Sequence, residues 1–60
     1  MEEENEFLEK CVCYCLPTEG KFIIGKIYSW RYIIDGIAVT DENGKEIPFD
    51  DIKFLWFFQK

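Results

Sequence analysis

The stretch from residue 26 to residue 49 decides the fold, and it reads KIYSWRYIIDGIAVTDENGKEIPF. It opens with residues 26–34, a long run of β-branched and aromatic side chains that favours a strand. Asp35-Gly36 follows, and this pair is a strong signal for a two-residue hairpin turn. Residues 37–40 are again β-branched and apolar. The first half of the stretch therefore predicts a β-hairpin.

A second turn comes directly after this hairpin. Asp41-Glu42-Asn43-Gly44 contains an Asn-Gly pair, which tolerates the left-handed backbone conformations of tight turns. Residues 45–49 then form another short strand. Because Pro48 has no amide hydrogen to donate, it predicts that this strand lies at a sheet edge or near its end.

The chain on either side continues the β pattern. Residues 11–15 alternate Cys with Val and Tyr, which predicts a first strand, and Pro17 and Gly20 predict a loop after it. Residues 50–52 resemble a single helical turn, and residues 54–58 are expected to be the last strand. Five short strands with tight turns predict an all-β fold, a small five-stranded antiparallel barrel over residues 10–60. Residues 1–9 hold five glutamates and are expected to be a partly ordered acidic N-terminal segment.

These turns and core positions resemble a family of small proteins with an SH3-like barrel that is common among uncharacterised bacteriophage products. The resemblance covers roughly residues 20–58, and the Cys-rich first strand and the Leu-Trp-Phe-Phe ending depart from it. It implies an SH3-like barrel, a location in the host cytoplasm, and a role as a host-modulating or counter-defence protein. The matching segments are Phe22-Ile23-Ile24-Gly25-Lys26-Ile27-Tyr28, Asp35-Gly36, Asp41-Glu42-Asn43-Gly44-Lys45, Pro48-Phe49 and Phe54.

Composition argues against several classes of function. The 60 residues carry a net charge of −5 and include no histidine, so the commonest general base is missing. We find no Gly-rich phosphate loop, and the acidity argues against direct nucleic-acid binding. We therefore expect a protein that is not an enzyme and uses no cofactor. The acidic start is unlike a signal peptide, and no apolar run is long enough for a membrane span, so we expect a cytoplasmic protein.

The three cysteines are expected to be reduced and to behave as small buried hydrophobic residues. Cys11, Cys13 and Cys15 share one face of the predicted strand, where neighbours two residues apart do not suit a disulfide. A zinc site normally needs four ligands, and this chain offers no further soft ligand. We therefore predict no metal site.

The aromatic ending predicts an interface. On a strand, Phe54, Trp56 and Phe58 would lie on one face and Leu55 and Phe57 on the other, so both faces would be apolar. One face fills the core, and the other needs cover from the N-terminal segment, through Phe7 and Leu8, or from a partner protein. A homodimer would also help a chain this short to build a sufficient core. The predicted interface residues are Trp30, Leu55, Trp56 and Phe57.

Two further groups are weighed against ordinary structural roles. Trp30 and Tyr32, with Lys26 and Arg31 close by, could stack a nucleotide or another small ligand, or could pack in the core and at the barrel rim. Acidic residues could form a rim around the interface, could imitate the phosphates of DNA, or could be solvated turn charges. These acidic residues are Asp41, Glu42, Glu46, Asp50 and Asp51.

Taken together, the sequence predicts a small non-enzymatic protein that binds and inhibits or modulates a host protein. The aromatic patch would supply the binding energy, and acidic residues would rim it. Two other classes stay open: a nucleotide-binding or small-molecule-binding sponge, and a structural, virion-associated module.

Overall fold

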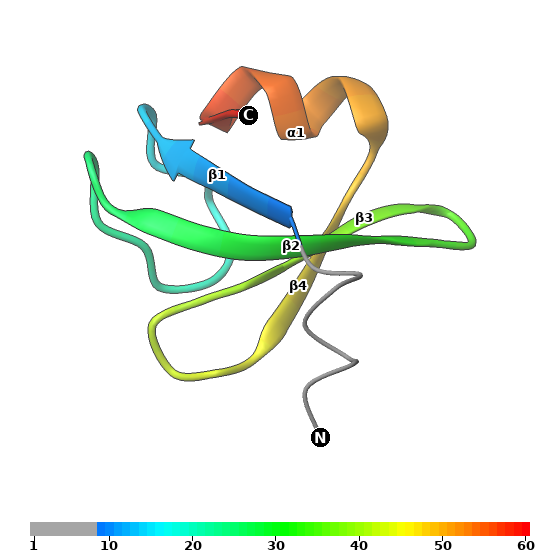
Figure 1. The fold of residues 1–60 in the computed structure, drawn as a ribbon, viewed down its shortest axis with the longest axis horizontal. Coiled ribbons are helices and arrows are strands. Elements are labelled where there is room, and N and C mark those ends of the chain that lie inside the picture. The colour runs from blue at the N-terminus through cyan, green and yellow to red at the C-terminus, as the bar shows by residue number, and fades with distance from the viewer. Residues whose placement is uncertain (1–8) are drawn as a thin grey trace.

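The computed structural model describes residues 9–60, and within them five antiparallel strands curl into a half-barrel with one short helix (Figure 1). This confirms the predicted fold class. The acidic segment, and with it the proposed cover by Phe7 and Leu8, lies almost wholly outside the described residues. The elements are β1 (Glu9–Cys13), β2 (Ile27–Ile33), β3 (Gly36–Thr40), β4 (Glu46–Phe49), α1 (Asp51–Phe57) and β5 (Phe58–Gln59).

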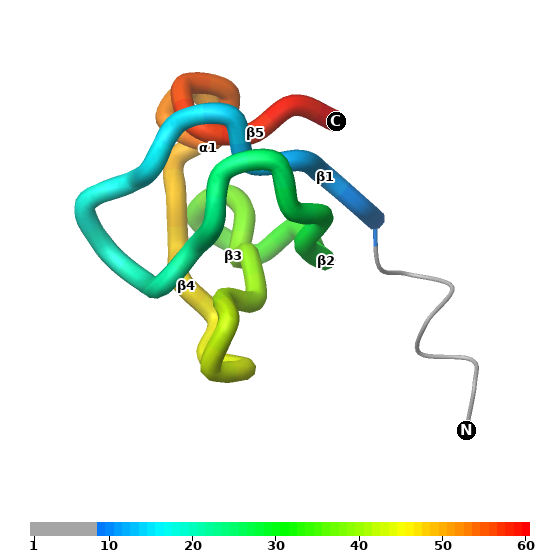
Figure 2. The backbone as a smooth tube through the Cα atoms, turned by 90° about the vertical axis from the view of Figure 1, so that its left-hand side faces the viewer, coloured from blue at the N-terminus to red at the C-terminus, as the bar shows by residue number. Residues whose placement is uncertain are grey.

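The strands lie in the order β4-β3-β2-β1-β5. The two predicted hairpins are confirmed, with Trp30 opposite Val39 in one and Val39 opposite Ile47 in the other. β4 is an edge strand, as Pro48 predicted. The long loop between β1 and β2 extends away from the strands (Figure 2) and then reaches the β3–β4 turn. There the backbone N–H of Lys21 donates a hydrogen bond to the Asp41 carboxylate.

The turns follow from particular residues. Gly36 has a φ of +147°, and a Cβ there would collide with the backbone oxygen of Phe49, so glycine is required. In the β3–β4 turn the Asp41 carboxylate accepts hydrogen bonds from the backbone N–H groups of Asn43 and Lys45, both at 2.9 Å. It also accepts the N–H of Lys21 at 3.1 Å, which ties the long loop to this turn.

Alternation along the strands builds the core. Every second residue of a strand faces the concave side of the sheet, and α1 covers the open side (Figure 1). Aromatic rings dominate the packing: the Phe54 and Phe58 rings stack at 5.4 Å, and the Trp30 ring lies 5.1 Å from Phe54. The buried core residues are Cys11, Cys13, Phe22, Tyr28, Trp30, Ile37, Val39, Ile47, Phe54 and Phe58.

The prediction of a strand over residues 54–58 is wrong. Helix α1 begins at Asp51 and ends at Phe57, and β5 is only Phe58–Gln59. Phe54 and Phe57 are spaced i and i+3, so the helix directs both toward the core, and the extended Phe58 that follows it is also buried there. A strand would have grouped Trp56 with Phe54, whereas the helix leaves Trp56 57% exposed.

The cysteine prediction holds for two of the three residues. Cys11 and Cys13 are buried, and all three thiols are free. Cys15 is exposed, because β1 ends at Cys13 and the chain then leaves the sheet. Burial and the neighbouring Cys13 raise the pKa of the Cys11 thiol to about 11, against a smaller lowering by its hydrogen bond to the Tyr28 backbone oxygen, so this thiol stays protonated near neutral pH.

Candidate binding site

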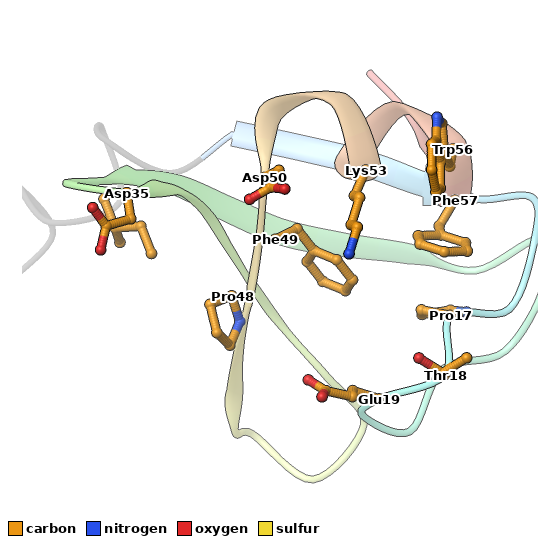
Figure 3. Close-up of a pocket in the computed structure, with 11 residues that line it drawn as sticks. Pro17, Thr18, Glu19, Asp35, Pro48, Phe49, Asp50, Lys53, Trp56 and Phe57 are labelled. Atoms are coloured by element: carbon orange, nitrogen blue, oxygen red, sulfur yellow. The ribbon is translucent and has the colours of Figure 1, made fainter.

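A groove of about 530 Å3 lies between the β1–β2 loop, the end of β4 and helix α1 (Figure 3). We call it the α1 groove. Its floor and walls come from segments far apart in the sequence, which the curl of the sheet brings together. The lining residues are Pro17, Thr18, Glu19, Ile33, Asp35, Pro48, Phe49, Asp50, Lys53, Trp56 and Phe57.

The apolar part of the groove is preformed. Phe49 and Phe57 are half-buried, with ring centroids 6.0 Å apart, and Phe49 is held from behind by Phe58 at 5.5 Å. Trp56 stands at the same end, with its ring 6.3 Å from that of Phe57. Because the Phe49 and Phe57 rings pack against the core, this part of the groove needs no rearrangement to receive a partner.

The polar part of the groove is acidic. Glu19, Asp35 and Asp50 line it with Lys53, which gives the lining a net charge of −2. Within residues 9–60 none of the three carboxylates forms a salt bridge. Lys53 extends from α1 toward the Phe49 ring, and Glu19 reaches in from the opposite side, while Asp35 lies at the far end (Figure 3).

Most of the predicted acidic rim has internal partners instead. Burial raises the pKa of the Asp41 carboxyl, but the three backbone N–H groups lower it by more, so its pKa lies below the ordinary value. This side chain is buried, so its assignment to a surface rim is wrong. Hydrogen bonds from Lys26 and Tyr28 lower the pKa of Glu42, and Lys26 Nζ lies 2.7 Å from it.

Of the remaining predicted rim residues, Glu46 has a partner within the chain, whereas Asp50 and Asp51 lie at or near the α1 groove. Arg31 donates two hydrogen bonds of 2.7 Å to Glu46, and this contact lowers the pKa of Glu46. The pair spans the outer face of β3, where Arg31 lies opposite Ala38 and Glu46 lies opposite Thr40. Asp50 lines the α1 groove, while Asp51 lies beside it on the exposed start of α1.

The prediction that places Trp30 at the interface is wrong. It is only 4% exposed, because its position on β2 faces the concave side of the sheet. Its indole N–H donates to the backbone oxygen of Lys10 at 3.3 Å, which completes a core role. Leu55 and Trp56 are both exposed, although the predicted strand would have placed them on opposite faces, and Phe57 forms part of the groove floor.

The predicted stacking residues do not form one site. Lys26 pairs with Glu42, Arg31 pairs with Glu46 on the outer face, and Trp30 is buried. Tyr32 is exposed at the end of β2, where its ring meets Trp30 edge to face. Lys60 lies over both rings, 5.0 Å from Trp30 and 6.0 Å from Tyr32, so a side chain of the same chain takes the cation position.

Sequence reasoning missed Glu19, Asp35 and Lys53 as site residues. The first two were interpreted only as loop and turn residues, and Lys53 lay between the predicted helical turn and the last strand. A helical spacing test on residues 51–57 would have placed Lys53 and Trp56 on one side of a helix. Nothing local joins Glu19 to that helix, because more than thirty residues separate them.

Within the part of the chain that the structure describes, no cluster of three or more Cys, Asp or Glu side chains is arranged to hold a metal ion. Among the same residues, no helix has the length and apolar character to cross a bilayer. No protein-family model, curated protein or solved structure matches this chain.

Proposed function

We propose that this chain is a non-enzymatic binding module that docks on another protein and inhibits or modulates it. The observation that carries the proposal is the exposed Trp56 beside a groove with an aromatic floor and carboxylates that form no salt bridge with any residue in the range 9–60. Tryptophan is the residue type most enriched among interface hot spots, and its burial by a partner supplies much of the binding energy. A missing histidine supports a binding role over catalysis.

The resemblance to phage-type barrel proteins gives the proposal its biological direction. It favours a host protein as the target and the host cytoplasm as the place, with interference in a defence system as one such role. In this setting the binding surface is the α1 groove with Trp56, and not the buried Trp30.

We also propose a homodimer, now through helix α1. Ile52 and Leu55 are spaced i and i+3 and both are more than half exposed, so they form an outer apolar stripe that leaves Trp56 to the α1 groove. A Leu55→Glu variant should be monomeric, and light scattering that finds wild-type monomer at about 100 μM would refute the dimer.

A capture experiment tests the docking function. Immobilised wild-type protein is compared with Trp56→Ser and with Ile34→Ser, in extracts of cells that express the protein. Ile34 is a matched control because it is 100% exposed and lies outside the α1 groove. We expect one stoichiometric partner on the wild type and on Ile34→Ser, and its loss on Trp56→Ser. Absence of a partner, or capture that ignores Trp56, would contradict the proposal.

A further inference from the structure

We infer that the α1 groove binds an extended peptide segment of the partner in which arginine or lysine residues alternate with apolar residues. The inference rests on the proposed docking function and adds the chemistry of the partner. Its basis is the combination, in one groove, of aromatic floor, exposed tryptophan and uncompensated negative charge.

The charges point to a basic ligand. The carboxylates of the β3–β4 turn and of β4 have partners in their own chain: Asp41 binds three backbone N–H groups, Glu42 binds Lys26, and Glu46 binds Arg31. Glu19, Asp35 and Asp50 form no salt bridge within the described residues, and all three line one groove. Guanidinium groups bind carboxylates through paired, charge-assisted hydrogen bonds, so an incoming arginine supplies what these residues lack.

The apolar lining of the α1 groove fits the apolar residues of the proposed peptide. The floor formed by Phe49, Phe57, Pro17 and Pro48 presents aromatic and aliphatic surface between the acidic positions. Trp56 offers a ring face on which an arginine or an apolar side chain can stack. A volume of about 530 Å3 falls within the range of sites that enclose a drug-sized ligand, which suits a few side chains of a peptide.

The edge of the sheet favours docking through side chains over strand addition. β4 is the edge strand beside the groove, and Pro48 in its middle cannot donate a backbone hydrogen bond. A peptide strand added to β4 would therefore lack part of its hydrogen-bond ladder. The peptide is held by its side chains, and its charge pattern determines whether it binds.

Replacing Lys53 should change the binding affinity in the opposite direction to replacing a groove carboxylate. Its ammonium group extends into the groove from α1, toward the floor (Figure 3). A basic ligand must approach this positive charge, so removing it should tighten binding, while removing any groove carboxylate should weaken it. A nonspecific loss of folding would weaken binding in both cases.

The experiment uses three fluorescein-labelled decapeptides and fluorescence anisotropy with the full chain. The first peptide alternates arginine with leucine, the second replaces each arginine by glutamine, and the third replaces each arginine by glutamate. We expect the arginine peptide to bind at least about tenfold more tightly than the glutamine peptide, with affinity falling as salt rises. We expect no saturable binding of the glutamate peptide.

Single variants then assign the preference to the groove. Glu19→Gln, Asp35→Asn and Asp50→Asn should each weaken binding of the arginine peptide about three- to tenfold. Asp50 makes no side-chain cap hydrogen bond, so its replacement leaves the start of α1 intact. Lys53→Gln should tighten binding about two- to fivefold. The matched control is Glu9→Gln at the start of β1, which removes the same charge away from the groove and should change affinity less than about twofold.

Several outcomes would overturn the inference. These are equal binding of all three peptides, preference for the glutamate peptide, equal weakening by Glu9→Gln and the groove variants, or no peptide binding at all. If Trp56-dependent capture of a protein persists in any of these cases, the docking function stands and only the basic-peptide assignment fails. If that capture is also absent, the proposed function itself fails.

Discussion

Replacing Phe54 and replacing Trp56 should have very different effects on stability. Phe54 is 0% exposed and its ring contacts Trp30 and Phe58, whereas Trp56 is 57% exposed. Truncating a buried phenylalanine to alanine costs about 3–5 kcal/mol. A chain of 60 residues has a total stability of about 3–9 kcal/mol. Phe54→Ala would therefore leave much of the protein unfolded, and a milder change is the better probe.

Phe54→Leu should lower the free energy of unfolding by about 1–2 kcal/mol, because it leaves part of the ring volume empty. Trp56→Leu should change it by less than about 0.5 kcal/mol, because the side chain is on the surface. Urea unfolding measured by far-UV circular dichroism gives both values. With a slope of about 1 kcal/mol per molar urea, Phe54→Leu should lower the midpoint by about 1–2 M.

The comparison discriminates between the helix and a strand. Residues 54 and 56 would share a face of a strand and would then be equally sensitive, whereas on α1 they point in different directions. Equal destabilisation by the two variants, or a greater effect of Trp56→Leu, would refute the helical arrangement. It would also refute the placement of Trp56 at the rim of the α1 groove.

Three other predictions concern the polar contacts and the thiols. Tyr28→Phe should lower the free energy of unfolding by about 1–2 kcal/mol in urea titrations, since its hydroxyl joins the Ile23 N–H to Glu42; an unchanged midpoint would contradict this role. Folding lowers the pKa values of Asp41 and Glu42 from their ordinary values of 3.8 and 4.5. The two carboxylates therefore stabilise the folded state fully above those ordinary values, and this stabilisation is lost as the pH falls through their lowered pKa values in the folded protein. Thermal unfolding should therefore show a falling Tm below about pH 4, and a flat profile would refute the assignment. Maleimide should modify only Cys15 in the native protein and the other two cysteines after unfolding, as mass spectrometry would show; rapid triple labelling would contradict their burial.

The binding surface could be predicted from the sequence only in part. Leu55 and Trp56 were named as interface residues because both faces of the expected C-terminal strand were apolar, but only the helix leaves both side chains exposed. Trp30 was misassigned although the flanking Ser29 and Arg31 are polar, because the aromatic face that it shares with Tyr28 and Tyr32 fits either a core or a binding surface. Whether Trp30 lies in the core or on the surface depended on which face of the sheet helix α1 covers.

What the sequence determined by itself is the strand meander of residues 26–49. Its hairpins depend on contacts a few residues apart, and Asp35-Gly36 and the Asn-Gly turn specify them through local backbone preferences. Only the tertiary structure decided the state of residues 51–57 and the existence of the α1 groove. Phe54 and Phe58 fit both a strand and a helix period, so packing against the curled sheet settled the choice. The groove joins Glu19, Asp35 and Asp50 through the curl of the sheet, and no local preference encodes such a juxtaposition.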